Sequence, residues 1–327
     1  MSIFFYAMRE FDELPCAQRA QEATGVRFGY AASYPSPENY ELARGFEGMS
    51  VTPCDLSAPV LEGLHAVGVR YILCRSIGYD HVDLEKARAL GMRVGTVSYP
   101  PTGVANYALM LMMMVCRRWP VIQKKAEAQD YTLHGKIGLD LSMRTVGVIG
   151  TGKIGATVIR ALSAMGCRVL AYDPYPNPAV SGMAEYVPLD RLLAESEVIT
   201  LHANVTAENY HLLDDAAFAK MRPDAIVVNT SRGKLIDHAA LIRALEAGRL
   251  WGAALDVLEN ENGLYYYDRT GDWIENREMA ILRSFPNVIL SPHTAFYTTD
   301  AVDYMVRGCF DNYVAFAAGK STANTVL

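Results

Sequence analysis

The fold is decided by one stretch, Thr145-Val146-Gly147-Val148-Ile149-Gly150-Thr151-Gly152-Lys153-Ile154-Gly155. An apolar, β-branched run passes directly into three glycines spaced G-x-G-x-x-G, and a helix-compatible segment, Ala156 to Met165, follows. The pattern predicts a strand, a tight turn and a helix N-terminus. In such a turn Gly150 permits the reversal, Gly152 lets the backbone approach a pyrophosphate, and Gly155 lets the helix pack against the strand. The free amides and the positive end of the helix dipole then hold the anion.

A second apolar run, Arg168 to Tyr172, ends in Asp173. An acid at this position accepts the ribose hydroxyls of an adenosine. A carboxylate also repels a 2′-phosphate, and Pro174-Tyr175-Pro176 supplies no neighbouring arginine, so we predict NAD rather than NADP. The alternative interpretation is a glycine-rich turn in which Asp173 is a solvated cap at the end of a strand.

The whole chain has 327 residues, which is too long for one ordinary hydrophobic core, so two domains are expected. Its net charge of −6 argues against nucleic acid or an anionic membrane as the main partner, and an anionic substrate must be held by a local cation. The six cysteines show neither C-x-x-C spacing nor histidine pairing, so we expect reduced thiols, a cytoplasmic protein and no metal site. The N-terminus, Met1 to Ala7, is interpreted as a first strand, and the longest apolar run, Val104 to Cys116, is too short to span a membrane.

The first hundred residues alternate short apolar runs with helical stretches. Strands are expected at Ile3 to Tyr6, Val26 to Tyr30, Met49 to Thr52, Tyr71 to Cys74 and Arg93 to Val97. Helices are expected at Pro15 to Thr24, Ser57 to Val67 and Leu84 to Leu90. This βα alternation predicts a parallel sheet with helices on its faces.

A proline pair interrupts this first unit in Tyr99-Pro100-Pro101-Thr102-Gly103. Prolines bar a helix and keep the preceding residues extended, so the segment is interpreted as a domain crossing. One long helix is expected after it, from Val104 to about Gln129, and its first half is apolar nearly all round. Such a helix must be buried, either by packing within its domain or by a dimer interface.

The alternation resumes in the second half. Strands are expected at Val146 to Ile149, Val169 to Tyr172, Val198 to His202, Ala225 to Asn229, Trp251 to Val257 and Val288 to Leu290. These six strands predict a doubly wound nucleotide-binding sheet. The segment Asn260 to Trp273 is interpreted as an irregular loop, and a last helix is expected at Asp300 to Phe316.

Three ionisable residues follow strands of this second sheet: Arg232, Glu261 and His293. Open α/β sheets bind ligands at the carboxyl ends of their strands, so the three side chains can converge on one point. Taken singly, each has an ordinary interpretation: a surface arginine, a solvated glutamate and a satisfied histidine.

The same residues carry a resemblance to a known family. The segments are Asn229-Thr230-Ser231-Arg232-Gly233, Asp256-Val257-Leu258-Glu259-Asn260-Glu261 and Ser291-Pro292-His293-Thr294-Ala295. Together with the glycine stretch, they resemble, in order and spacing, the signature blocks of the D-specific 2-hydroxyacid dehydrogenases. The resemblance implies an α/β protein with two doubly wound parallel-sheet domains. Residues 1–100 and 297–327 would form a flavodoxin-like substrate domain, and residues 101–296 a Rossmann NAD-binding domain with a dimerisation helix.

The resemblance implies that His293 is the acid/base, Glu261 its hydrogen-bonded partner and Arg232 the substrate clamp. Reduction of a 2-oxo acid delivers a hydride to the carbonyl carbon and a proton to its oxygen. An imidazolium supplies that proton near neutral pH, and a neighbouring carboxylate stabilises the imidazolium. The planar donor fork of an arginine binds the substrate carboxylate or polarises the carbonyl.

Further positions carry over by the same resemblance. On the substrate side they are the backbone amides of Ser76, Ile77 and Gly78, with Tyr99 and Phe296 in the pocket. On the cofactor side they are Gly150, Gly152, Lys153, Ile154, Gly155, Asp173, His202, Ala203, Asn204, Thr230, Ser231 and Asp256. Asp256 would bond the nicotinamide carboxamide or simply cap its strand, and His202 would line the adenosine or belong to the core. Asn204 replaces a usual proline.

The resemblance is closest to the D-lactate dehydrogenase branch and implies reduction of pyruvate to D-lactate by NADH in a homodimer. Phe296 stands where tyrosine is expected in that branch, which favours a reductase of aromatic or branched-chain 2-oxo acids as the alternative. Tyr265 to Tyr267 either border the pocket or pack their loop. A second alternative, of another class, is an NAD-sensing protein that binds partners and turns over poorly.

Overall fold

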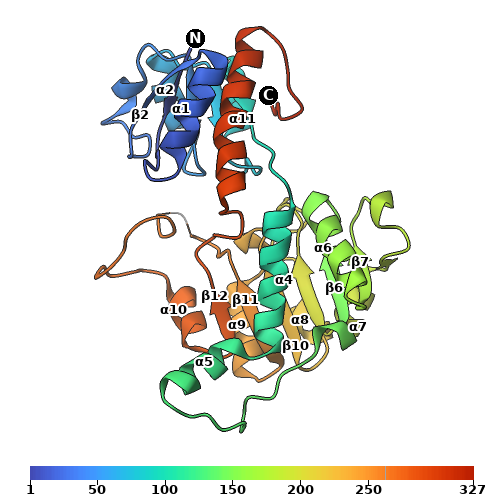
Figure 1. Cartoon of the computed structure of the whole chain (residues 1–327). Helices are drawn as coiled ribbons and strands as arrows, with labels where there is room; N and C mark the ends of the chain where they lie inside the picture. Colours follow the sequence, from blue (N-terminus) through green and yellow to red (C-terminus); the bar gives the residue numbers. More distant parts are fainter. Residues whose placement is uncertain (262) are drawn as a thin grey trace. The chain divides into compact units, whose positions relative to one another are not determined.

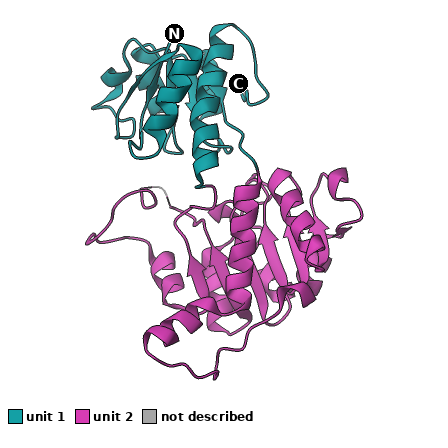
Figure 2. Ribbon diagram, viewed as in Figure 1, with its two compact units in different colours: residues 1–100, 297–327 teal, residues 101–296 magenta. Residues whose placement is uncertain are grey.

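The computed structural model describes residues 1–261 and 263–327. The chain divides into two compact units, one formed by Met1–Pro100 with Tyr297–Leu327 and the other by Pro101–Phe296 (Figure 2). Each unit is an α/β structure around a parallel sheet, as the sequence predicts.

The first unit contains one five-stranded sheet. All its strands run parallel, in the order β2-β1-β3-β4-β5 that is typical of flavodoxin-like sheets. The strands are β1 (Ser2–Phe5), β2 (Arg27–Tyr30), β3 (Gly48–Val51), β4 (Tyr71–Cys74) and β5 (Arg93–Gly95). The helices are α1 (Glu13–Thr24), α2 (Ala58–Ala66), α3 (Leu84–Ala89) and α11 (Thr299–Ala317). Helix α11 packs against α1 and β4, so the C-terminal segment completes this unit (Figure 1).

A buried ion pair fixes the end of β4. The guanidinium of Arg75 lies 3.0 Å from Glu13, and both side chains are fully buried. Arg75 also donates to the carbonyl oxygens of Tyr6 and Ala7 at 2.8 and 2.9 Å. A buried charge needs such partners, so Arg75 ties the turn after β4 to the ends of β1 and α1.

The second unit contains one seven-stranded parallel sheet in the order β12-β11-β10-β9-β6-β7-β8. Its strands are β6 (Thr145–Ile149), β7 (Arg168–Tyr172), β8 (Glu185–Tyr186), β9 (Val198–Leu201), β10 (Ala225–Asn229), β11 (Leu250–Leu255) and β12 (Val288–Leu290). Strand order reverses between β6 and β9, which is the switch point of a doubly wound sheet. The prediction of a doubly wound fold is confirmed, but the sheet has one strand more than the six predicted, because β8 is only two residues long and lies at the edge.

Helices cover both faces of this sheet. They are α4 (Thr102–Cys116), α5 (Trp119–Glu127), α6 (Lys153–Ala164), α7 (Leu189–Glu195), α8 (Asp215–Lys220), α9 (His238–Glu246) and α10 (Arg277–Ser284). Helices α4 and α6 pack side by side and share one core with the sheet (Figure 1). Helices α7 to α10 contribute to the other core.

The prediction of one helix from Val104 to Gln129 is wrong. The chain forms two helices, α4 and α5, and Arg118 between them has a left-handed backbone with φ of +52°. Pro120 is the physical reason, because a proline inside a continuous helix lacks the N–H donor and its ring clashes with the carbonyl of the residue four positions earlier, Cys116. Helix α4 buries eight of its side chains within the unit, so packing inside the domain accounts for most of its apolar surface.

Candidate active site

The register of the second sheet aligns the residues that end its strands. Ile149 pairs with Leu201, Leu201 with Asn229, Asn229 with Leu255, and Leu255 with Leu290. The next residues, which begin the loops, therefore lie along one edge of the sheet: Gly150, His202, Thr230, Asp256 and Ser291. This edge brings together the glycine turn and the loops that carry Arg232, Glu261 and His293.

The glycine turn is shaped by close backbone contacts. Gly150 has a φ of +91°, and a Cβ on it would lie 2.6 Å from the backbone of His202 and Ala203. A Cβ on Gly155 would lie 2.0 Å from the carbonyl oxygen of Gly150. Gly152 begins α6 as its N-cap and a Cβ there would meet open space. The helix N-terminus therefore has an open approach, which fits the pyrophosphate of a dinucleotide.

Asp173 lies beside this turn. Its carboxylate accepts from the backbone N–H of Thr151 at 2.7 Å and from that of Tyr175 at 2.9 Å. Thr151 is buried, its hydroxyl accepts from Tyr186 at 2.9 Å, and its carbonyl accepts from Asn177 at 2.7 Å. Thr151 was not predicted as a site residue; it joins the glycine turn to the loop after β7 and to strand β8. Lys153 and Ile154 follow in the first turn of α6.

The strand ends β9 and β10 are linked across the same edge. The hydroxyl of Ser231 donates to the carbonyl of Ala203, and the carbonyl of Asn204 accepts from Asn209 at 2.7 Å. His202 Nε2 lies 2.9 Å from the Thr200 hydroxyl, and burial lowers the pKa of His202 to about 4, so the ring is neutral at physiological pH. Its buried Nδ1 has no hydrogen-bond partner within residues 1–261 and 263–327.

The loop that carries Arg232 is fixed by hydrogen bonds to Asn229 and by a close backbone contact at Gly233. Asn229 donates to the carbonyl of Arg232 at 2.9 Å and accepts from the N–H of Ser231 at 2.9 Å, while Thr230 is buried between them. A Cβ on Gly233 would lie 2.1 Å from the backbone of Leu258. Only glycine permits such a close backbone contact, so Gly233 lets the loop that carries Arg232 pack directly against the loop that leads to Glu261. No role was predicted for Gly233 from the sequence.

His293 and Glu261 form a direct pair. Nδ1 of His293 lies 2.6 Å from Oε1 of Glu261, and each side chain is 21% exposed. The other oxygen of Glu261 accepts from the backbone N–H of Leu258 at 2.8 Å, so both carboxylate oxygens are engaged. A carboxylate on Nδ1 fixes the proton there and leaves Nε2 for a ligand. The predicted pair is therefore present in the structure.

Asp256 holds the loop that contains His293. The carboxylate is fully buried and accepts from the Ser291 hydroxyl at 2.6 Å, from the Thr294 N–H at 2.9 Å and from the Ala295 N–H at 2.8 Å. Its carbonyl accepts from the His293 N–H at 2.7 Å. These contacts favour the interpretation of Asp256 as a strand-end cap, and the contact with a nicotinamide carboxamide stays a prediction.

Two aromatic rings surround His293. The ring centres of Tyr266 and Phe296 lie 6.0 and 6.3 Å from that of the imidazole, and Tyr266 packs edge-on against Phe296 at 6.4 Å. The hydroxyl of Tyr266 donates to the carbonyl of His293 at 2.9 Å. Of the three predicted loop tyrosines, Tyr266 thus borders the site, whereas Tyr265 is buried in the core. Residue 262, inside the predicted irregular loop, lies outside the described residues.

The predicted substrate turn belongs to the first unit. The hydroxyl of Ser76 donates to the carbonyl of Gly78 at 2.6 Å, and Ile77 between them is exposed. The carbonyl of Ser76 accepts from Val97 at 3.1 Å, which links this turn to the segment that leads to Tyr99.

Two kinds of site are not found in the part of the chain that the structure describes. No group of three or more His, Cys, Asp or Glu side chains there is arranged to hold a metal ion. No described helix has the length and apolarity needed to cross a membrane.

Comparison with known proteins identifies the family. Residues 109–295 match the family model of the NAD-binding domain of D-isomer specific 2-hydroxyacid dehydrogenases. The D-lactate dehydrogenase of Escherichia coli is 36% identical over 100% of both chains, and an aromatic 2-oxoacid reductase of Clostridium sporogenes is 35% identical over 94% of this chain and 93% of the other. A solved D-2-hydroxyisocaproate dehydrogenase superposes with a TM-score of 0.88 at 33% identity, covering 100% of this chain and 99% of the other. The chain therefore belongs to the D-isomer specific 2-hydroxyacid dehydrogenases, which bind NAD.

Proposed function

We propose that the chain reduces pyruvate to D-lactate with NADH. The observation that carries this proposal is the 2.6 Å contact of His293 with Glu261, at the strand edge that also presents Arg232 and the glycine turn. The relatives named for D-lactate support the choice of substrate within the family.

Separate groups of residues would bind the cofactor and the substrate. The amides around Gly152 and the first turn of α6 would hold the pyrophosphate of the dinucleotide, and the Asp173 carboxylate would accept hydrogen bonds from its adenosine ribose. The bound NADH supplies the hydride. Arg232 clamps the carboxylate of the 2-oxo acid with its planar donor fork. In the first unit, the backbone amides of Ser76, Ile77 and Gly78 stay the predicted carboxylate-binding turn.

His293 transfers the proton. Because Glu261 accepts from Nδ1, the N–H on Nε2 donates to the carbonyl oxygen of the substrate as the hydride arrives. The negative charge of Glu261 balances the imidazolium before transfer, and the hydrogen bond from Leu258 keeps the carboxylate oriented. In the reverse direction the neutral imidazole takes the proton from the 2-hydroxy acid.

A second substrate class has a structural observation in its favour. Phe296 and Tyr266 place two aromatic rings beside His293, and such a wall also suits phenylpyruvate or a branched 2-oxo acid. One changed pocket group moves discrimination by about 1–3 kcal/mol, which biases between substrates without excluding either.

The test is NADH oxidation by the purified protein at neutral pH, with pyruvate and phenylpyruvate in parallel and with NADPH as a second cofactor. We expect a higher kcat/KM for pyruvate and much slower turnover with NADPH, because Asp173 repels a 2′-phosphate. A clear preference for phenylpyruvate would move the substrate to the aromatic class. Turnover of neither would support a binding protein that senses NAD.

The roles of the two basic residues have their own test. Replacing His293 by Gln should remove most turnover and leave NADH binding nearly intact, whereas an active variant would refute the acid/base role. Replacing Arg232 by Lys should raise KM and slow turnover, because a lysine does not reproduce the bidentate fork. If neither parameter changes, Arg232 is a structural residue.

We also propose a homodimer. Large apolar side chains between residues 110 and 143 are 40% to 88% exposed: Met110, Met113, Trp119, Tyr131, Leu133, Ile137 and Met143. Such a concentration of exposed apolar groups is typical of a protein interface. Light scattering coupled to gel filtration should give twice the mass of the chain. A variant with Leu133→Glu and Ile137→Glu should shift the equilibrium toward the monomer, and a wild-type protein that elutes as a monomer would refute the proposal.

A further inference from the structure

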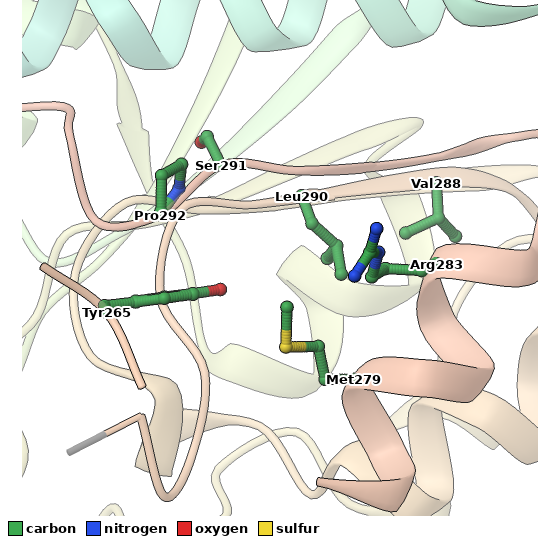
Figure 3. A pocket seen from close by; sticks show the side chains of 7 residues that line it. All are labelled: Tyr265, Met279, Arg283, Val288, Leu290, Ser291 and Pro292. Carbon is green, nitrogen blue, oxygen red and sulfur yellow. The ribbon is translucent and has the colours of Figure 1, made fainter. Parts of the chain in front are cut away.

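A cavity lies in the second unit on the side of helix α10. Its volume is about 310 Å³, within the size range of small-molecule sites. It lies between α10, β12 and the loop after β11, and its lining residues are Tyr265, Met279, Arg283, Val288, Leu290, Ser291 and Pro292 (Figure 3). None of the residues that we assign to the substrate or the cofactor lines this cavity.

The first polar group of the cavity is the hydroxyl of Tyr265. Tyr265 is 7% exposed, and its hydroxyl has no hydrogen-bond partner within residues 1–261 and 263–327. Burial raises the pKa of Tyr265, so the group is a neutral O–H donor. A buried hydroxyl without a partner destabilises the protein, and a ligand that accepts its hydrogen bond recovers this loss. Figure 3 shows the hydroxyl directed into the cavity.

The second polar group is the guanidinium of Arg283. In the part of the chain that the structure describes, no carboxylate forms an ion pair with Arg283, which belongs to the C-terminal half of α10. Arg283 and Tyr265 line the same cavity. Figure 3 shows the guanidinium and the Met279 side chain pointing toward the same space as the hydroxyl.

Apart from Ser291, whose hydroxyl bonds Asp256, the remaining lining residues are apolar, and they define the rest of a ligand. Val288, Leu290 and Pro292 form one side, and the thioether of Met279 makes favourable contacts with an aromatic ring. A cation, an O–H donor and apolar walls together fit a carboxylate on a short apolar body. We propose that this cavity binds a small apolar monocarboxylate as a second site, separate from the substrate site.

The cavity is connected to both members of the catalytic pair. The backbone N–H of Tyr265 donates to the carbonyl of Glu261 at 3.1 Å. Ser291 and Pro292, which also line the cavity, directly precede His293, and the Ser291 hydroxyl donates to Asp256 at 2.6 Å. A ligand that presses on Tyr265 and Pro292 therefore acts on the two segments that set the distance between Glu261 and His293. A carboxylate bound in this cavity therefore changes kcat without competing with the 2-oxo acid for the substrate site.

Calorimetry with phenylacetate tests the binding site directly. Phenylacetate carries the carboxylate and an aromatic body, and it has no 2-oxo group to reduce. We expect saturable binding to the wild-type protein, also in the presence of saturating NADH and oxamate, an isostere of pyruvate. The neutral analogue 2-phenylethanol should bind at least tenfold more weakly, because it lacks the charge that Arg283 recognises.

Two matched variants locate the site. Arg283→Gln should weaken phenylacetate binding at least tenfold, and Arg277→Gln, an exposed arginine at the other end of α10, should leave it unchanged. Tyr265→Phe should weaken binding less than Arg283→Gln. In kinetics, phenylacetate should change kcat at saturating 2-oxo acid in the wild type and not in Arg283→Gln.

Three results would overturn the proposal: no binding of phenylacetate, binding that oxamate abolishes, or equal binding by the wild type and Arg283→Gln. The calorimetric readout needs no turnover, so this inference fails or stands separately from the proposed substrate.

Discussion

Replacing Glu261 by Gln probes the catalytic pair with the smallest change of shape. In the wild type, Oε1 accepts from Nδ1 of His293 at 2.6 Å and Oε2 accepts from the N–H of Leu258 at 2.8 Å. A glutamine has one oxygen for these two donors. Its amide nitrogen faces either the imidazole or the Leu258 N–H, and in both orientations a donor is set against a donor. The imidazolium also loses its counter-charge.

The size of the effect follows from the contact that is lost. A hydrogen bond to a charged group contributes about 1.5–3 kcal/mol. At about 1.36 kcal/mol per factor of ten, kcat should fall roughly 10- to 150-fold. Partial exposure of both side chains screens the pair, which favours the lower half of this range. The affinity for NADH should stay within twofold, because the carboxylate of Glu261 bonds His293 and Leu258, which lie outside the glycine turn.

Stopped-flow NADH oxidation in a single turnover measures the chemical step, and fluorescence titration measures NADH binding. Glu259→Gln is the matched control, because Glu259 also pairs with a histidine, His211, at 2.9 Å, and lies two residues from Glu261. The control should retain kcat within twofold. The reasoning is refuted if Glu261→Gln retains wild-type turnover, or if Glu259→Gln loses as much.

Three further predictions follow from single contacts. Gly155→Ala places a Cβ 2.0 Å from the Gly150 carbonyl oxygen, so it should lower the stability by about 1–3 kcal/mol and abolish NADH binding. The Cβ of Gly152→Ala meets open space, so this variant should lower only the affinity for NADH. Thermal melts measure the stability of the two variants, and fluorescence titration measures their NADH binding. Burial lowers the pKa of His202 to about 4, so this side chain takes up a proton when the protein unfolds at mildly acidic pH. The free energy of unfolding should therefore fall by roughly 2 kcal/mol from pH 7.5 to pH 5. Thermal melts at both pH values should show a smaller fall in stability for His202→Gln. Tyr266→Phe removes the hydrogen bond to the His293 carbonyl and should lower kcat about 2- to 10-fold without changing NADH affinity, and an unchanged kcat would exclude a positioning role.

Strands were the most predictable part of the fold. The buried strands β9, β10 and β11 are nearly continuous apolar runs, which are typical of a parallel sheet buried on both faces. The two-residue edge strand β8 carries no such signal, because its pairing with β7 depends on the chain that returns to it. The break between α4 and α5 was predictable from Pro120, but the predicted helix was extended across it from its apolar first half.

Within the candidate site, the sequence indicated which side chains converge, but it did not indicate which contacts hold those side chains in place. The blocks around Arg232, Glu261 and His293 were visible because their residue types match a known chemistry. The roles of Thr151 and Gly233 depend on what approaches them from other segments of the chain. Such contacts between distant segments are a property of the folded backbone, and a single sequence does not display them.

The conformation of His293 shows how this site is prepared before a substrate binds. Its φ of +52° lies in the left-handed region, which costs a non-glycine residue of order 1–3 kcal/mol, although histidine tolerates it better than most. Asp256 offsets this cost because its carboxylate accepts hydrogen bonds from Ser291, Thr294 and Ala295 and its carbonyl accepts one from the His293 N–H. The Tyr266 hydroxyl also donates to the His293 carbonyl. Because the backbone is fixed from both sides, the imidazole has one remaining contact to make on its Nδ1 side, and Glu261 supplies it. The orientation of Nε2 is therefore set by the protein itself, so that substrate binding does not have to bear the cost of ordering the proton donor.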